Sequence, residues 1–318
     1  MSKLLFALAI SVAGCSAASQ RPVGYDYAGE PDVDPHPGKP RGERPHVPDD
    51  VVERASGAVT AYDLASGEQL SDAVLARELL RADAVCLGEE HDSAAHHFLE
   101  LWTIELLAAR APSLGLELGV GFEMFQRAFQ APLSDYQLGK IDEVDLLERS
   151  QYDQRWGFPF AFYRPVLESA REHRLALVAL NARRELTREV ARQGLDAIDR
   201  SYEPELPNLD LGQREHRAAF ERAMEGHPGL SRDKLDRYYA AQVVWDETMA
   251  EQGARWLNAH APVRRLVILA GRAHCQRSAI PARIERRGAG RVHAVLLGTE
   301  KPAAGSASEF DYALTVSP

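Results

Sequence analysis

The chain has 318 residues, of which 45% are hydrophobic and 26% charged, so it can bury a sizeable core in one large domain or two smaller ones. Its formal net charge is −10 with no dominant basic block. This excludes nucleic acid as an expected partner, because nucleic-acid binding relies on clustered Lys and Arg.

The first residues have the features of a targeting segment. Lys3 provides a positive start, and the apolar run from Leu4 to Ile10 is too short to span a bilayer. This run leads into Val12-Ala13-Gly14-Cys15, which resembles the lipobox of bacterial lipoproteins. The resemblance implies that residues 1–14 are removed, that Cys15 is lipidated, and that the protein is anchored in the outer membrane. An ordinary signal peptide with an incidental cysteine is the alternative.

Residues 15–50 are predicted to form a tether. The segment from Gln20 to Asp50 is rich in proline, interleaved with Gly and charged residues, and has almost no apolar periodicity. Such a composition favours an extended, poorly ordered chain. It would hold a globular domain, residues 51–318, away from a membrane surface.

The globular domain alternates predicted strands with predicted helices. A short strand or hairpin arm is expected at 59–62, and buried strands are expected at 84–88, 114–123, 175–180, 265–270 and 292–297. Helical spacing predicts helices at 71–81, after Ser93 to 107, and at 124–137, 142–149, 160–173, 213–224 and 232–259. This order predicts an α/β fold with a parallel-rich central sheet flanked by helices and an additional helical subdomain.

Polar residues follow four of these strands at the point where each one ends. Glu89 and His91 follow the first, Glu123 ends the second, Asn181 ends the third, and His274 follows the fourth. Both histidines stand at the end of a Gly-x-x-His pattern. Because parallel strands end at one edge of a sheet, where ligands bind in open α/β folds, we expect these groups to converge.

The converging residues allow three interpretations. Two histidines with Glu89 and Glu123 would suit a divalent transition metal. The same side chains could instead form a polar wall beside a larger ligand. A purely structural alternative is that His91 and Glu123 satisfy the NH groups of helix N-termini.

Two further stretches bear on the site. On the predicted helix 232–259, Tyr239, Gln242 and Asp246 form one polar stripe that is expected to face the site. The aromatic stretch from Tyr152 to Tyr163 could line a flat apolar pocket, although ordinary core packing would explain most of its members.

Two cysteines, Cys86 and Cys275, stand near the ends of predicted strands. They could form a disulfide only if their Cα atoms lie within about 7 Å. The sequence leaves this open, and two buried free thiols are the alternative.

Six short segments together resemble the ChaN-like haem-binding lipoproteins of the Tiki superfamily, which also includes the erythromycin esterases. They are GEEHD at 88–92 with His96-His97, FEMF at 122–125, NAR at 181–183, YAAQVVWDETMA at 239–250, GRAH at 271–274 and IPAR at 280–283. The resemblance covers roughly residues 84–297. The long-helix segment is specific, whereas the Gly-x-x-His patterns are shared across the superfamily.

This resemblance implies a surface-anchored protein that binds haem in bacterial iron acquisition, often as a homodimer, with a haem receptor of the outer membrane as a further partner. It also implies a tyrosine phenolate as axial ligand of ferric haem with a nearby histidine, a chemistry known for haem. The expected tyrosines are Tyr152 and Tyr163, and Tyr239 is a further cofactor-binding candidate. The expected histidines are His91, His97 and His274.

The hydrolase branch of the superfamily implies a different use of the same strand ends. There, Glu89, His91, Glu123 and His274 would surround a divalent ion such as Zn or Mn. The ion would activate water by lowering its pKa. Haem binding without catalysis is our first expectation, and a metal-dependent hydrolase is the alternative.

Overall fold

The computed structural model describes residues 47–225, 230–303 and 305–317. Across these residues the chain forms one sheet of eight strands in the order β2-β1-β8-β7-β3-β6-β4-β5. The strands are β1 (Ala58–Asp63), β2 (Gln69–Leu70), β3 (Ala84–Glu89), β4 (Glu117–Gln126), β5 (Ala176–Asn181), β6 (Arg264–Gly271), β7 (Val292–Gly298) and β8 (Tyr312–Ser317). All neighbours from β8 to β5 pair in parallel, and only β1 pairs antiparallel with its neighbours.

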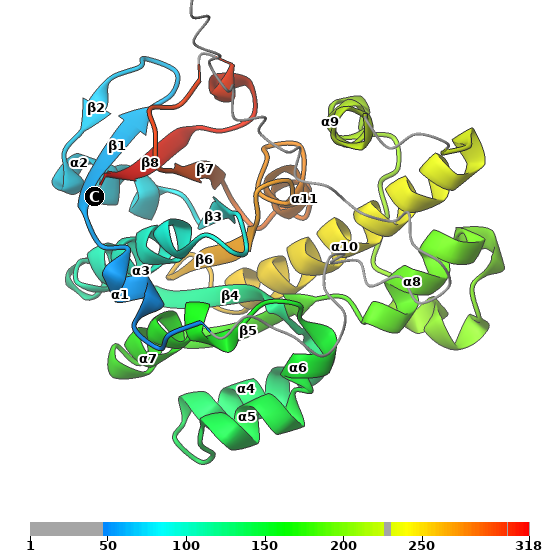
Figure 1. Cartoon of the computed structure of the whole chain (residues 1–318), viewed down its shortest axis with the longest axis horizontal. Helices are drawn as coiled ribbons and strands as arrows, with labels where there is room; N and C mark the ends of the chain where they lie inside the picture. The colour runs from blue at the N-terminus through cyan, green and yellow to red at the C-terminus, as the bar shows by residue number, and fades with distance from the viewer. Residues whose placement is uncertain (1–46, 226–229, 304, 318) are drawn as a thin grey trace, which may run out of the picture.

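Helices cover both faces of this sheet (Figure 1). They are α1 (Val51–Arg54), α2 (Asp72–Arg81), α3 (Ala94–Ala108), α4 (Gln130–Gln137), α5 (Glu143–Arg149), α6 (Tyr152–Arg155), α7 (Arg164–Glu172), α8 (Arg184–Gln193), α9 (Arg214–Met224), α10 (Arg232–Ala259) and α11 (Ile280–Arg286). Short 3₁₀ turns, including η3 (Phe160–Phe162) and η5 (Arg200–Glu205), connect some of them. Helices α4, α5 and α6 lie together beyond the β5 edge of the sheet.

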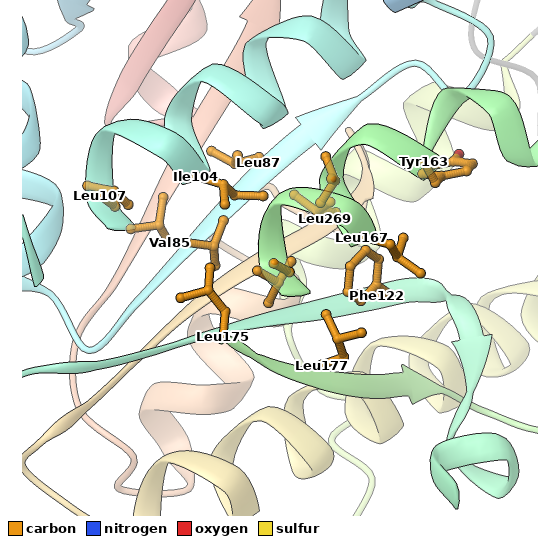
Figure 2. Packing of buried hydrophobic residues seen from close by; sticks show 14 of the residues in the cluster. Val85, Leu87, Ile104, Leu107, Phe122, Tyr163, Leu167, Leu175, Leu177 and Leu269 are labelled. Carbon is orange, nitrogen blue, oxygen red and sulfur yellow. The ribbon is translucent and has the colours of Figure 1, made fainter. Parts of the chain in front are cut away.

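Alternation along the central strands divides the core into two clusters. In β3, Val85 and Leu87 belong to one cluster, whereas Ala84 and Cys86 belong to the other. Successive side chains of a strand point to opposite faces, so the two clusters lie on opposite sides of the sheet. Helices α2, α3 and α7 complete the first, and α8, α10 and α11 complete the second. Figure 2 shows Ile104 of α3 close to Val85 and Leu87 in the first cluster.

The predicted α/β class is confirmed, with local corrections. The second strand extends to Gln126 instead of giving way to a helix at 124, because Met124 and Phe125 are buried and continue the strand. A helix therefore begins only at Gln130. The predicted helix 160–173 starts at Arg164, since Pro165 in its first turn fixes a helix N-terminus. Strand β8 was not expected; it lies between β7 and β1.

Cys86 of β3 and Cys275, which follows β6, form a disulfide with their Cα atoms 5.2 Å apart. The alternative of two free thiols is therefore wrong. The bond joins residues 189 positions apart in the sequence, and it fixes the segment after β6 against the central strand.

Residues 1–46, which include the expected leader, Cys15 and most of the tether, lie outside the described residues. Within the described part of the chain, no helix is both long and apolar enough to cross a membrane.

Candidate functional site

The candidate site lies at the ends of β3 and β6, the neighbouring strands from which the chain continues toward opposite edges of the sheet. Strand β3 pairs with β6 on one side and β7 on the other, and the connections after β3 and β6 leave toward opposite edges. Glu89 at the end of β3 is in register with Gly271 at the end of β6. The two Gly-x-x-His motifs therefore start side by side at the carboxyl edge, where α/β proteins bind ligands.

His91 is held by a buried carboxylate of its own motif. Its Nδ1 contacts Glu89 Oε1, and the hydroxyl of Tyr163 donates to the same oxygen at 3.0 Å. Burial would raise the pKa of Glu89, but the imidazoles of His97 and His91 reverse this and lower it to about 2. Burial opposes the charged form of His91, but Glu89 outweighs it and raises the pKa of that imidazole.

Two residues of α3, His97 and Glu100, lie next to Glu89. His97 Nε2 donates to the backbone carbonyl of His91 at 3.1 Å. Its Nδ1 lies 3.2 Å from Glu89 Oε2 and 2.9 Å from Glu100 Oε2. Burial, and then the charge of Glu89, raise the pKa of Glu100 well above its usual value. We refer to Glu89, His91, His97 and Glu100 as the first arm.

His274 is held by a carboxylate from a distant helix. Its Nδ1 donates to Asp246 Oδ1 of α10 at 2.5 Å, and its Nε2 lies 3.4 Å from Glu123 Oε1. Burial would lower the pKa of His274, but the charges of Glu123 and Asp246 raise it to about 9. His274 is therefore an imidazolium near neutral pH. Burial alone would raise the pKa of Asp246, but His274 and His216 lower it overall.

The other oxygen of Asp246 faces a second histidine. His216 Nε2 lies 2.8 Å from Asp246 Oδ2, and its Nδ1 accepts from Arg283 Nη2 at 3.1 Å. Because a guanidinium can only donate, this contact places the proton of a neutral His216 on Nε2. We refer to His274, Asp246, His216 and Arg283 as the second arm.

The two arms meet at Gly271. A side-chain carbon added at Gly271 would lie 3.0 Å from His91 Nε2 and 3.7 Å from Glu123 Oε2. Glu123 Oε2 accepts from the backbone N–H of Gly271 at 2.7 Å. The structure thus brings together Glu89, His91, Glu123 and His274, all named from the sequence.

Other residues named from the sequence lie further from this point. Tyr239 contacts His216 and donates to the Gln213 carbonyl. It therefore lies next to the second arm, on the side of His216. Tyr152 donates to the Phe158 carbonyl and is 1% exposed. Asn181 donates to the Glu123 carbonyl and supports that strand end. From the polar stripe on α10, Gln242 and Asp246 contact His274 directly.

Glu100 and His216 of the site were not predicted from the sequence. Glu100 lies three positions after His97 on α3, and this helical spacing could have indicated the pair. His216 approaches from α9, and no local pattern connects it to Asp246. Among the described tyrosines, Tyr202 of η5 alone has an intermediate exposure.

The charged rim beside the site comes from the same two motifs. Arg272 Nη2 pairs with Glu90 Oε1 at 2.9 Å, and both side chains are partly exposed. His96 faces inward, where its Nδ1 accepts from the Glu90 N–H. Burial, followed by the charge of Arg272, lowers the pKa of His96 to about 4. His96 is therefore neutral and structural near neutral pH.

Comparison with known proteins finds a matching family and solved structures of similar fold. Residues 75–284 match the family model described as haem-binding uptake, Tiki superfamily, ChaN. A solved structure described as cofacial heme binding to ChaN of Campylobacter jejuni is similar in fold, with 18% identity, a TM-score of 0.65, and coverage of 82% of this chain and 97% of that chain. A mutant of the erythromycin esterase EreC in its open conformation matches at 14% identity and a TM-score of 0.44, covering 82% of this chain and 83% of that chain. No curated protein matches the chain.

Proposed function

Because the chain belongs to the ChaN haem-binding uptake family of the Tiki superfamily, we propose that it binds ferric haem at the edge of the sheet where β3 and β6 end. Haem would supply a ferric iron that accepts axial ligands from the protein. The C. jejuni ChaN structure, whose description names cofacial haem, shares this fold.

The geometry of His91 is the observation that carries the proposal. Its Nδ1 is held by the buried Glu89 carboxylate, and its side chain keeps 17% exposure beside the rim. In metal-binding histidines, a carboxylate on one ring nitrogen fixes the tautomer and makes the other nitrogen more basic. His97, in contrast, is fully buried and hydrogen-bonded on both ring nitrogens.

The tyrosine ligand requires a phenol that haem can reach. Tyr163 is 0% exposed, and burial together with the Glu89 charge raises its pKa well above the usual value, which opposes a phenolate. Tyr202 is less buried; burial also raises its pKa, but the Arg183 guanidinium, 5.8 Å from its ring centroid, partly offsets this rise. We therefore add Tyr202 to Tyr152 and Tyr163 as candidate axial ligands.

A titration of the purified full-length protein with ferric haem tests this proposal. We expect a saturable, equimolar shift of the Soret band with charge-transfer bands typical of phenolate. The variants Tyr202→Phe, Tyr163→Phe and Tyr152→Phe, each lacking one hydroxyl, should identify the ligand by loss of those bands. The absence of a saturable shift in the unmodified protein would overturn the proposal.

We also propose that lipid on Cys15 anchors the protein in the outer membrane, that it forms a homodimer, and that an outer-membrane haem receptor is its partner. The lipobox-like Val12-Ala13-Gly14-Cys15 supports the anchor. Metabolic labelling with palmitate should mark the native chain, and Cys15→Ser should abolish both the label and membrane recovery. A Cys15→Ser chain that stays in the outer-membrane fraction would contradict the anchor.

A hydrolase is the second candidate function. It is favoured by the two carboxylate-supported imidazoles, His91 and His274, that flank Glu123. A pair of this kind can act in general acid–base catalysis. Because His274 carries a proton near neutral pH, a Zn or Mn ion bound there would have to displace that proton. Ester hydrolysis that is lost in Glu123→Ala and does not require haem would support this function.

A further inference from the structure

The inner part of the first arm buries two carboxyl groups on either side of one imidazole. The carboxylates of Glu89 and Glu100 are 2% and 0% exposed, and His97 between them is also fully buried. One ligand atom from each of these residues lies within 4.8 Å of the other two. Burying carboxylates without compensation is costly, so this pocket requires a positive charge or a proton.

The imidazole of His97 directs an acceptor into the same pocket. Because Nε2 donates to the His91 carbonyl at 3.1 Å, a neutral His97 has its lone pair on Nδ1. That Nδ1 faces oxygens of both Glu89 and Glu100. In addition, Glu89 Oε2 and Glu100 Oε1 are buried, and no donor group of another residue hydrogen-bonds to them, so only a proton shared between the two carboxyl groups or a cation can satisfy these oxygens. The Nδ1 lone pair of His97 and the carboxyl oxygens of Glu89 and Glu100, all hydrogen-bond acceptors, therefore face one another.

We propose that Glu89, His97 and Glu100 bind a divalent transition-metal ion of the zinc or manganese class. One imidazole nitrogen with two carboxylates is a ligand set that such ions accept. The bond from His97 Nε2 to the His91 carbonyl is the kind of outer hydrogen bond that orients a metal-binding histidine.

This site differs from the one that the sequence suggested. It uses His97 and Glu100 of α3 in place of His91, Glu123 and His274, and its ligands are shielded from solvent. Glu89 is shared, and its other oxygen holds His91 and Tyr163. A bound ion would therefore fix the carboxylate that positions His91. The inference stands on this cluster and does not require haem binding.

Metal analysis of the purified full-length protein tests the proposal. The protein is stripped with a chelator under denaturing conditions, refolded with zinc or manganese chloride, desalted, and analysed for bound metal. Glu100→Gln removes a ligand charge while keeping the size of the side chain. Glu105→Gln is the matched control, because Glu105 lies on the same helix and bonds Ser169 and His173 outside the cluster. Glu123→Gln tests the alternative site.

We expect equimolar metal in the unmodified protein, in Glu105→Gln and in Glu123→Gln, and substoichiometric metal in Glu100→Gln. The unmodified protein should also melt at a higher temperature with metal than without it. Substoichiometric metal in the unmodified protein would overturn the proposal and indicate a proton shared between Glu89 and Glu100. Metal retained in Glu100→Gln but lost in Glu123→Gln would also overturn it. A haem titration of the metal-free protein separates this result from the proposed function.

Discussion

The two arms hold their histidines in similar ways but are assembled differently. In each, Nδ1 of a histidine faces a buried carboxylate, and a second histidine lies behind that carboxylate. The first arm comes from one stretch, Glu89 to Glu100, and ends in another carboxylate. The second arm collects residues from α9, α10, α11 and the loop after β6, and it ends in the Arg283 guanidinium. The two carboxyl groups of the first arm need a shared proton or a cation between them, whereas in the second arm one carboxylate faces two imidazoles.

The largest expected effect comes from removing the carboxylate of the second arm. Asp246→Ala should destabilise the protein by about 3–5 kcal/mol, because it leaves the buried imidazolium of His274 without its carboxylate partner. Urea unfolding checks this. Asp236→Ala on the exposed face of the same helix is the control, expected to cost about 1 kcal/mol or less. Equal effects of the two variants would contradict the charge balance assigned to the second arm.

The disulfide connects the strand of the first arm to the loop of the second. Replacing both cysteines, Cys86→Ser with Cys275→Ser, should reduce the free energy of unfolding by about 2–5 kcal/mol. Because Cys275 follows His274, haem affinity should also fall. Unfolding and haem titration with and without a reductant measure the two effects. Unchanged stability after full reduction would mean that the arms are fixed independently of the bond.

Titration of His274 should make stability depend on pH through the second arm. Its pKa rises from 6.5 to about 9 on folding, so its contribution is complete below pH 6.5 and is lost as pH rises through about 9. We expect a loss of about 1–3 kcal/mol over this range. His274→Gln should flatten the profile. An unmodified protein that becomes more stable toward pH 9 would contradict the assigned charge of His274.

The smallest expected effect on stability comes from the contact between the arms. Gly271→Ala places a carbon 3.0 Å from His91 Nε2 and should cost about 1 kcal/mol by overpacking. Its effect on haem affinity should be larger, because it displaces His91. Gly305→Ala, where nothing lies within 4 Å of the added carbon, is the matched control. Equal haem affinities in both variants would place the haem away from His91.

The same comparison explains what the sequence could predict. The first arm lies within one strand–turn–helix segment, so the strand end and the turn indicated Glu89 and His91 directly, whereas His97 was named through the family resemblance. Only part of the second arm could be predicted from the sequence. Asp246 belonged to a polar stripe on a buried helix, but His216 and Arg283 reach it through the packing of other helices, which no local pattern encodes.

Local errors in the fold have similar causes. The extension of β4 to Gln126 depends on burial of Met124 and Phe125 against distant elements, so helical and strand patterns were both compatible with the residues themselves. The disulfide depended on a Cα separation that only the pairing of β3 with β6 sets. Ordinary core packing, which was expected for most of the aromatic stretch, applies to Tyr152 and Tyr163: both are buried, against Phe125 and Trp156 respectively.

The most direct test of the account is a ferric haem titration of the full-length protein beside His91→Gln, followed by absorption. We predict a saturable, equimolar Soret shift in the unmodified protein and a loss of affinity of about tenfold or more in His91→Gln, which removes the imidazole that Glu89 holds. A haem complex that is unaffected by His91→Gln, or no saturable complex in the unmodified protein, would contradict haem binding at this edge of the sheet.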